Sequence, residues 1–293
     1  MTKKNSEKIK RLLWATDFSK ESRACLPYIK FISGKLKTHN YAMYVLPKFA
    51  DWIYETAFLK DDELFETIER TRRSSLKKIE KYSKKSELTF EAEVHEGLAS
   101  DEIIEYAGKN KVDMIFAGRR GVSEIEQILI GSTTSRLIRN SPVPIFVIPK
   151  TKREVKIDTI LCPIDLSEWT LKELRYAIPL AKQLGAKLYA IHVSEFFNYK
   201  VPVLKRDKLI ETINEKIAAI AEEHDYKIEE IIYEIGEPAK KIMEVAKKRK
   251  MDLITMATHQ RKGFEKFFLG SITEKVLMYC NTPVLVLPPG QDE

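Results

Sequence analysis

Short apolar runs alternate with longer amphipathic stretches along the whole chain. In the first half, the apolar runs predict β-strands at residues 11–16, 41–46, 88–94, 113–117 and 144–148. The stretches between them predict helices, of which the longest covers about residues 61–83 and carries its apolar side chains at helical spacing. Strands that alternate with such helices are typical of an α/β fold, with a mostly parallel sheet covered on both faces and right-handed crossovers.

The second half repeats this pattern in the same order. Asp17 and Asp165 follow the first apolar run of each half and lie 148 positions apart, whereas Gly131-Ser132 and Gly270-Ser271 lie 139 positions apart. The nine-residue difference falls between the second and third strands, around residues 51–63. A tandem duplication explains this order. The predicted strands of the second half are residues 159–164, 188–193, 228–234, 252–257 and 283–287.

The length and composition agree with two folded domains. The chain has 293 residues, and about 150 residues per domain is usual. We therefore expect like domains at residues 1–150 and 151–293, joined by a short charged linker. The apolar runs are far shorter than the ~20 residues of a membrane-spanning helix, and no apolar segment of a secretory signal follows the basic N-terminus. We expect a cytoplasmic protein without a membrane partner.

The spacing of the cysteines and histidines and the net charge exclude several classes of function. The three cysteines form no CxxC pair and the five histidines form no zinc motif, so neither a disulfide framework nor a dedicated metal site is expected. The net charge is +7, but lysine and glutamate are interleaved along the chain, as on solvated helices. We therefore expect no nucleic-acid partner, while a mild positive field suits a small anionic ligand.

Two glycine-containing segments follow the fourth predicted strand of the first half. Gly118-Arg119-Arg120-Gly121 is followed, after nine residues, by Gly131-Ser132 at the start of a predicted helix. Glycines let backbone N–H groups approach phosphate oxygens closely, and a helix N-terminus favours negative charge. The alternative is that these glycines only form a turn and a helix cap.

This arrangement resembles the universal stress protein family in its tandem two-domain form. The resemblance covers about residues 10–288 and rests on Asp17 with Ser19, on the GxxG-x9-GS spacing and on the apolar last strand. It implies a doubly wound, five-stranded, Rossmann-like domain of the adenine nucleotide alpha hydrolase-like class. Many members bind ATP or AMP, often with Mg²⁺ bridging the phosphates, so the resemblance implies an ATP, ADP or AMP ligand here.

The resemblance also implies which residues would contact the nucleotide. Gly118, Gly121, Gly131 and Ser132 would hold the phosphates, Asp17 would lie beside the nucleotide, and Val45 would back the adenine. An aspartate at this position can instead cap the following helix. The full expected set in the first half is Ala15, Thr16, Asp17, Val45, Ala117, Gly118, Gly121, Gly131, Ser132 and Thr133.

The second half departs from the family pattern. Ala257 and Gln260 replace the two glycines of GxxG, and a glutamine disfavours both the backbone conformation and the close approach. Arg261 and Lys262 can attract an anion, or can simply belong to a solvated loop. We expect weaker binding here than in the first half. The corresponding residues are Pro163, Asp165, Val193, Gly270 and Ser271.

No catalytic group is evident beside the expected phosphate site. The chain has no Walker loop, GxGxxG, GxSxG or kinase motif. Arg119 and Arg120 could stabilise phosphate charge, but phosphoryl transfer also needs a positioned base. His259 is expected in a loop and His192 as a packed core residue. Three functions stay open: a nucleotide-binding stress regulator or sensor, a slow ATPase or phosphotransferase, and a scaffold that binds no nucleotide.

The last strand of each half is apolar on both faces. Val143 to Ile148 and Val284 to Leu287 would be association hazards if they stayed at an exposed sheet edge. Family members commonly pair through this strand. We therefore expect the two halves to pair with each other as an internal pseudo-dimer, and we leave open a homodimer of the whole chain and further protein partners.

Overall fold

The computed structural model describes residues 8–48, 61–120, 130–149, 155–195, 203–258 and 269–288. Within these ranges each half of the chain alternates strands and helices, as the sequence pattern predicts. No helix in the described ranges is long and apolar enough to cross a membrane.

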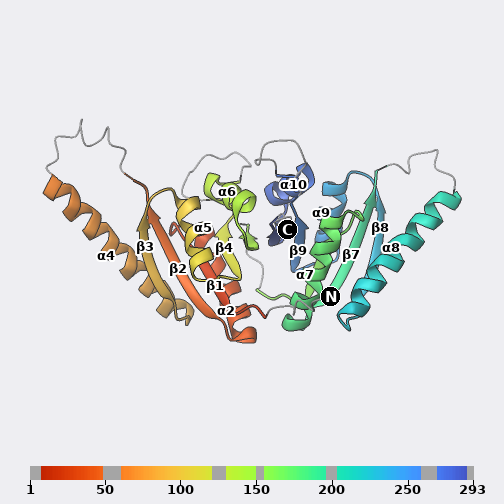
Figure 1. Ribbon diagram of the computed structural model, residues 1–293, viewed down its shortest axis with the longest axis horizontal. Coiled ribbons are helices and arrows are strands. Elements are labelled where there is room, and N and C mark those ends of the chain that lie inside the picture. Colours follow the sequence, from red (N-terminus) through yellow and green to blue (C-terminus); the bar gives the residue numbers. More distant parts are fainter. Residues whose placement is uncertain are drawn as a thin grey trace.

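The two halves contain matching elements in the same order (Figure 1). The first half comprises β1 Arg11–Ala15, α1 Lys20–Arg23, α2 Cys25–Leu36, β2 His39–Leu46, α4 Asp61–Ser86, β3 Glu91–Glu96, α5 Ala99–Lys109, β4 Met114–Gly118, α6 Ser132–Asn140 and β5 Ile145–Ile148. The second comprises β6 Thr159–Pro163, α7 Glu168–Leu184, β7 Lys187–Ser194, α8 Val203–Glu223, β8 Glu230–Ile235, α9 Pro238–Lys248, β9 Leu253–Ala257, α10 Ser271–Tyr279 and β10 Val284–Leu287.

The ten strands form one continuous sheet with the order β3-β2-β1-β4-β5-β10-β9-β6-β7-β8. Every neighbouring pair is parallel except β5 and β10, which are antiparallel. Each half therefore has the doubly wound order 3-2-1-4-5, and the second half is its counterpart across the β5–β10 seam. The expected α/β fold and the internal pseudo-dimer are both confirmed.

The seam is formed by the two apolar last strands. Phe146 pairs with Leu285, and the pairs on either side are Val147 with Val284 and Ile145 with Val286. All six residues are at most 2% exposed, so the strand that would be an association hazard in an isolated half is buried against its counterpart. Pairing at this point removes two sheet edges and leaves only β3 and β8 as edges.

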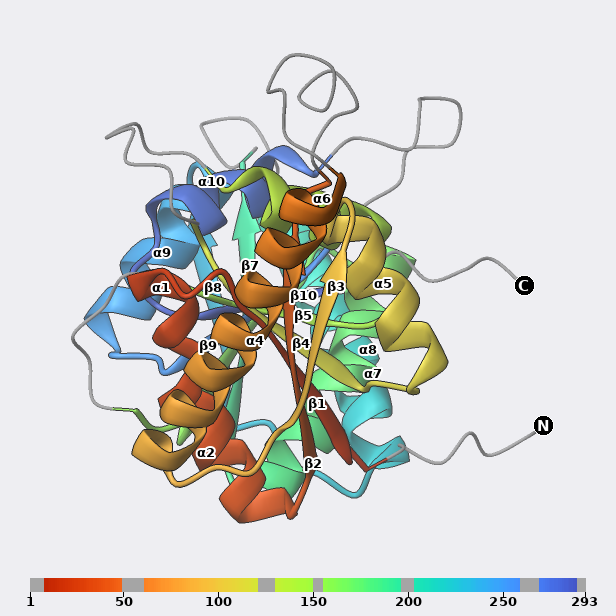
Figure 2. The same ribbon diagram turned by 90° about the vertical axis from the view of Figure 1, so that its left-hand side faces the viewer.

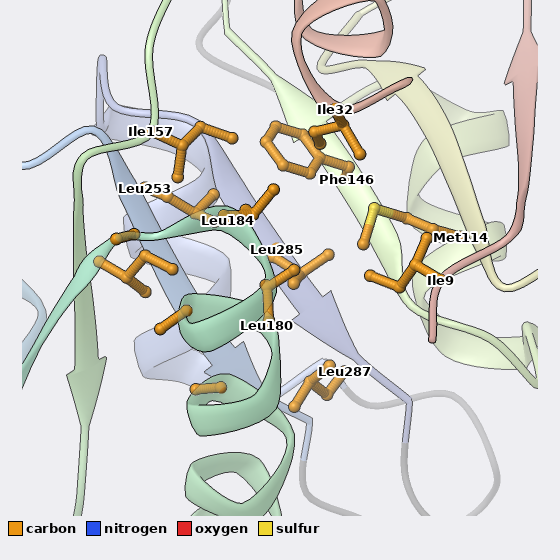
Figure 3. Close-up of a cluster of buried hydrophobic side chains, with 14 of the residues drawn as sticks. Ile9, Ile32, Met114, Phe146, Ile157, Leu180, Leu184, Leu253, Leu285 and Leu287 are labelled. Carbon is orange, nitrogen blue, oxygen red and sulfur yellow. The ribbon is translucent and has the colours of Figure 1, made fainter. Parts of the chain in front are cut away.

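Helices cover both faces of the sheet, and each face has one apolar core that runs through both halves (Figure 2). Residues of α2, α4, α7 and α8 pack on one face, and residues of α5, α6, α9 and α10 on the other. Near the seam, Ile32 and Phe146 of the first half lie close to Leu184 and Leu285 of the second (Figure 3). Because neither core stops at the seam, the halves stabilise each other through side chains as well as through the β5–β10 ladder.

Two cations of the first half cap helices of the second half. Lys35 Nζ donates to the backbone oxygen of Leu184, at the end of α7, over 2.6 Å. Arg119 Nη1 donates to the backbone oxygens of Leu277, Met278 and Cys280 at the end of α10, at 3.3, 3.1 and 2.9 Å. Cations at a helix C-terminus satisfy its free carbonyls and oppose the negative end of its dipole.

Local turns explain why some positions repeat between the halves. Gly97 follows β3 with φ +156°, and Gly236 follows β8 with φ +139°, a region that favours glycine. The nine-residue difference lies between the second and third strands, because β2 and β7 begin 148 positions apart and β3 and β8 begin 139 apart. The strand predicted at 88–94 was placed too early, since β3 is Glu91–Glu96.

The Arg119 cap is expected to contribute to the stability of the joined halves. Arg119→Gln should lower the free energy of unfolding by about 2 kcal/mol, because a half-buried cation with three carbonyl acceptors is lost. Urea denaturation followed by circular dichroism measures this change. Arg175→Gln is the matched control, since its ion pair with Glu223 is about half exposed and such pairs contribute little. Equal effects of the two substitutions would contradict the assigned role.

Candidate functional site

The strand order changes direction between β1 and β4, and the candidate site lies at the carboxyl ends of these strands. In open parallel sheets, ligands bind outside the strand ends at such a switch point. The β1–β4 ladder ends with Trp14 paired to Phe116, before the last residues of either strand. Ala15 and Ala117 follow these positions, and both are buried.

Hydrogen bonds fix the chain where it leaves β1. The buried Thr16 hydroxyl accepts from the Phe18 amide at 3.0 Å and lies 3.1 Å from the Ser22 hydroxyl. Asp17 Oδ1 accepts from the Ser19 amide at 2.9 Å, and Ser19 itself is the N-cap of α1. Asp17 is therefore not the helix cap. Its carboxylate supports the turn and stays half-buried at the strand end.

Gly118 is required by close packing against α1. A Cβ atom at this position would lie 2.7 Å from the backbone carbon of Glu21 and 2.7 Å from the nitrogen of Ser22. The sequence predicts that this glycine lets backbone approach a phosphate, and the structure shows a further reason for it, the close approach of β4 to α1. Ala257 holds the matching position in the second half, where a Cβ is present.

The N-terminus of α6 lies beside the end of β4. Gly131 is its N-cap, and no side chain of the described residues caps the helix. The Thr134 hydroxyl donates to the backbone oxygen of Gly118 at 2.8 Å, which holds the first turn of α6 against the strand end. Ser132 is exposed and Thr133 half-buried in this turn. Free amides at such a helix start are suited to bind an anion.

The other predicted residues of the first half have different positions. Val45 lies in β2, 9% exposed, within the same core cluster as Ala15 and Ala117. Gly121, the second glycine of the predicted phosphate loop, lies outside the described residues. The structure therefore brings Asp17, Gly118 and Gly131 to one edge, and it does not test the middle of the loop.

The second half repeats the framework of this edge. Asp165 Oδ1 accepts from the Ser167 amide at 2.9 Å, and Ser167 is the N-cap of α7. The Thr273 hydroxyl donates to the backbone oxygen of Ala257 at 3.0 Å. Thr134 and Thr273 were missed, although both stand 139 positions apart in matching segments. Pro163 ends β6, Val193 lies in β7, Gly270 is the N-cap of α10, and Ser271 is its first residue.

A buried carboxylate distinguishes the second half. Glu173, 2% exposed, accepts from the Thr255 hydroxyl at 2.6 Å, the Ala257 amide at 2.7 Å and the Cys162 thiol at 3.5 Å. Burial raises the pKa of Glu173 to about 7, although these hydrogen bonds oppose the shift. Sequence reasoning missed this residue. The only available signal was an acidic side chain 148 positions after Cys25, a residue of the buried helix face.

One of the two arginines that could stabilise phosphate charge has another role in the structure. Arg119 donates to the C-terminus of α10. His259 and Gln260, together with residues 261–263, lie outside the described part of the chain. Among the residues that the structure describes, no group of three or more His, Cys, Asp or Glu side chains could hold a metal ion.

Comparison with known proteins agrees with the geometry. The model of the universal stress protein family matches the chain twice, at residues 8–149 and 156–288. A universal stress protein of Methanocaldococcus jannaschii is 36% identical over 143 residues, which are 46% of this chain and 84% of that protein. The two family matches fall on the two structural halves.

Of two solved structures, one matches both halves of the chain, and the other matches less than half of it. A universal stress protein of Archaeoglobus fulgidus covers 97% of this chain and 100% of its own, with a TM-score of 0.75 and 23% identity. Another universal stress protein, solved in complex with cAMP, is 21% identical, covers 46% of this chain and 98% of its own, and has a TM-score of 0.36. The two family matches, together with the doubly wound order of each half, show that the chain belongs to the universal stress protein family.

Proposed function

We propose that the first half binds an adenine nucleotide and that the chain acts as a stress-response regulator or sensor. The nucleotide, ATP, ADP or AMP, would lie across the ends of β1 and β4, with its phosphates at the first turn of α6. The observation that carries the proposal is the α6 N-terminus without a side-chain cap, held beside the switch point by Thr134.

The residues present fit such a ligand. The amides of Ser132 and Thr133, in the first turn of α6, would hold the phosphates, and the Ser132 hydroxyl would add a donor. Asp17 lies at the end of β1, and its second carboxylate oxygen, which accepts no hydrogen bond from the described residues, can accept from a hydroxyl of the ligand. A bound Mg²⁺ would neutralise phosphate charge, and it would have to take most of its ligands from phosphate and water.

We propose that the second half binds a nucleotide more weakly, if at all. The Glu173 carboxylate accepts from the amide of Ala257. Ala257 is the last residue of β9, which is the counterpart of β4 in the second half. Above about pH 7, where Glu173 is ionised, its buried negative charge disfavours a phosphate nearby, because burial weakens screening. The first half has the neutral Cys25 at the matching position.

One experiment distinguishes nucleotide binding from the two alternative functions, a slow ATPase or phosphotransferase and a scaffold. The protein is purified under native conditions, its nucleotide is extracted, and added ATP is followed over hours. Retained ATP supports the binding function, stoichiometric ADP supports a slow ATPase or phosphotransferase, and the absence of nucleotide supports a scaffold. The proposal places the chain in the cytoplasm. It also includes a homodimer of the whole chain and binding to other proteins.

A charge placed at each helix N-terminus tests the site. Ser132→Glu should weaken ATP binding at least about 100-fold, because a carboxylate at the first turn of α6 competes with the phosphates. Ser271→Glu is the matched control at the first turn of α10 and should leave the affinity nearly unchanged. Both residues are exposed, and an acidic residue suits a helix start, so neither change should disturb folding. Calorimetric titration with ATP measures both variants, and equal loss would contradict the asymmetry.

The Glu173 carboxyl should make stability depend on pH. Its pKa is about 7 in the fold against an ordinary value of 4.5, so the folded chain keeps this proton between these values while the unfolded chain loses it. Stability from this group is therefore full below about pH 4.5 and falls by about 3 kcal/mol as the pH rises to about 7.

Glu173→Gln should remove this dependence. Glutamine has the same shape and keeps an oxygen for the Ala257 amide, but it carries no ionisable proton. Urea unfolding at pH 5 and pH 8 measures the difference between variant and parent. Glu222→Gln, an exposed position on α8, is the control and should retain the parent's slope. A Glu173→Gln variant with an unchanged slope would show that the carboxyl titrates normally.

A further inference from the structure

The second half contains a cavity at the carboxyl ends of β7 and β8, beneath α8. Its volume is about 270 Å³. A cavity of this size can hold a small organic molecule, and its place at the ends of parallel strands is where ligands bind in this class of fold. The lining residues are His192, Ser194, Leu209, Ile210, Ile213, Tyr233, Glu234 and Ile235.

Two lining positions of the cavity carry larger side chains in the first half. The α4 and α8 helices end with the same bond, from Leu88 N to Ser83 O and from Tyr226 N to Ala221 O, so position 72 of α4 matches position 210 of α8. Arg72 therefore stands where the second half has Ile210. It reaches β3, donating to the Val94 oxygen at 2.8 Å.

A second replacement enlarges the same space. Tyr44 in β2 matches His192 in β7, 148 positions later. The Tyr44 ring packs on Phe18 with centroids 4.9 Å apart, and position 166, which matches Phe18, is a leucine. At positions 166, 192 and 210 the second half therefore has the smaller side chain.

The lining favours an uncharged ligand that donates a hydrogen bond. His192 Nδ1 lies 2.8 Å from the backbone oxygen of Ile164, and a carbonyl only accepts, so Nδ1 carries the proton. In the neutral ring Nε2 is then an acceptor. The Tyr233 hydroxyl already donates to Asn214 Oδ1 at 2.8 Å, and Glu234 pairs with Lys241 of α9 on the opposite face of the sheet.

The cavity lies in the second half and is therefore separate from the nucleotide site proposed in the first half. Successive side chains of a strand point to opposite faces, so His192 and Val193 of β7 face different sides of the sheet. Val193 packs with the core under α9 and α10, whereas the cavity lies under α8. The site therefore does not depend on nucleotide binding.

We propose that this cavity binds a small, uncharged aromatic molecule that carries one hydrogen-bond donor, with His192 Nε2 as its acceptor. Leu209, Ile210, Ile213 and Ile235 supply apolar walls for the ring. An anionic relative would find no cation among the lining residues that the structure describes and would lose its hydration without compensation from them.

Three probes of nearly equal shape test the chemistry at pH 8. Indole has a ring N–H, benzothiophene lacks the donor, and indole-3-carboxylate adds a negative charge. Calorimetric titration should give a dissociation constant on the order of 100 µM for indole. Benzothiophene should bind about fivefold more weakly, the value of one net hydrogen bond. The carboxylate should bind at least about tenfold more weakly. Equal affinities, or no indole binding at 5 mM (about 50 times that constant), would overturn the proposal.

Two substitutions locate the probe. Ile210→Phe fills the cavity and should weaken indole at least about tenfold. Ile272→Phe adds the same bulk at an exposed position of α10 and should change nothing. His192→Leu should remove the preference for indole over benzothiophene while benzothiophene still binds. If His192→Leu does not fold, Ile210→Phe still tests whether indole binds in this cavity. Retained indole affinity in that variant would contradict the proposal. ATP affinity should be the same in the parent and in Ile210→Phe, which separates this site from the proposed function.

Discussion

At the centre of the sheet, three antiparallel residue pairs between β5 and β10 join two halves that are otherwise parallel throughout. Every strand beyond the seam continues the hydrogen-bonding of the strand before it, and both apolar cores run across it. Had these two strands stayed unpaired, each half would expose an apolar edge. Their pairing buries both apolar edges within one molecule.

Covalent linkage has allowed the two halves to differ. In a homodimer, each contact across the seam would occur twice, whereas here Arg119 caps α10 and its counterpart is Thr258, whose hydroxyl donates to Leu287 O. The second half has likewise acquired Glu173 and the cavity beneath α8, while the first has Gly118 pressed against α1. The same backbone thus supports two chemically different strand-end edges. This division agrees with one half specialising in an anionic ligand.

Part of the candidate site could be predicted from the sequence, because the residue patterns that indicate it lie within short segments. Ser19 as an N-cap, Gly131 before α6 and the strand-ending Asp17 follow from short segments, and the structure brings them to one edge. The packing role of Gly118 was missed, since the atoms that exclude its Cβ belong to Glu21 and Ser22, nearly a hundred residues earlier. The hydrogen-bond partners of Arg119 could not be predicted from the sequence either, because its three acceptors lie in the other half.

The sequence by itself determined the repeat, the order of strands and helices and a mostly parallel α/β fold, because hydrophobic periodicity and repeat spacing are properties of the chain alone. The resemblance to the universal stress protein family added the doubly wound order and, together with the apolar character of the last strands, their pairing. Tertiary structure alone decided which polar groups are buried, what each cation caps and where space remains. Glu173 has a raised pKa, and His192 borders a cavity, because of neighbours from distant segments. Desolvation and packing depend on all surrounding atoms, so no local pattern specifies them.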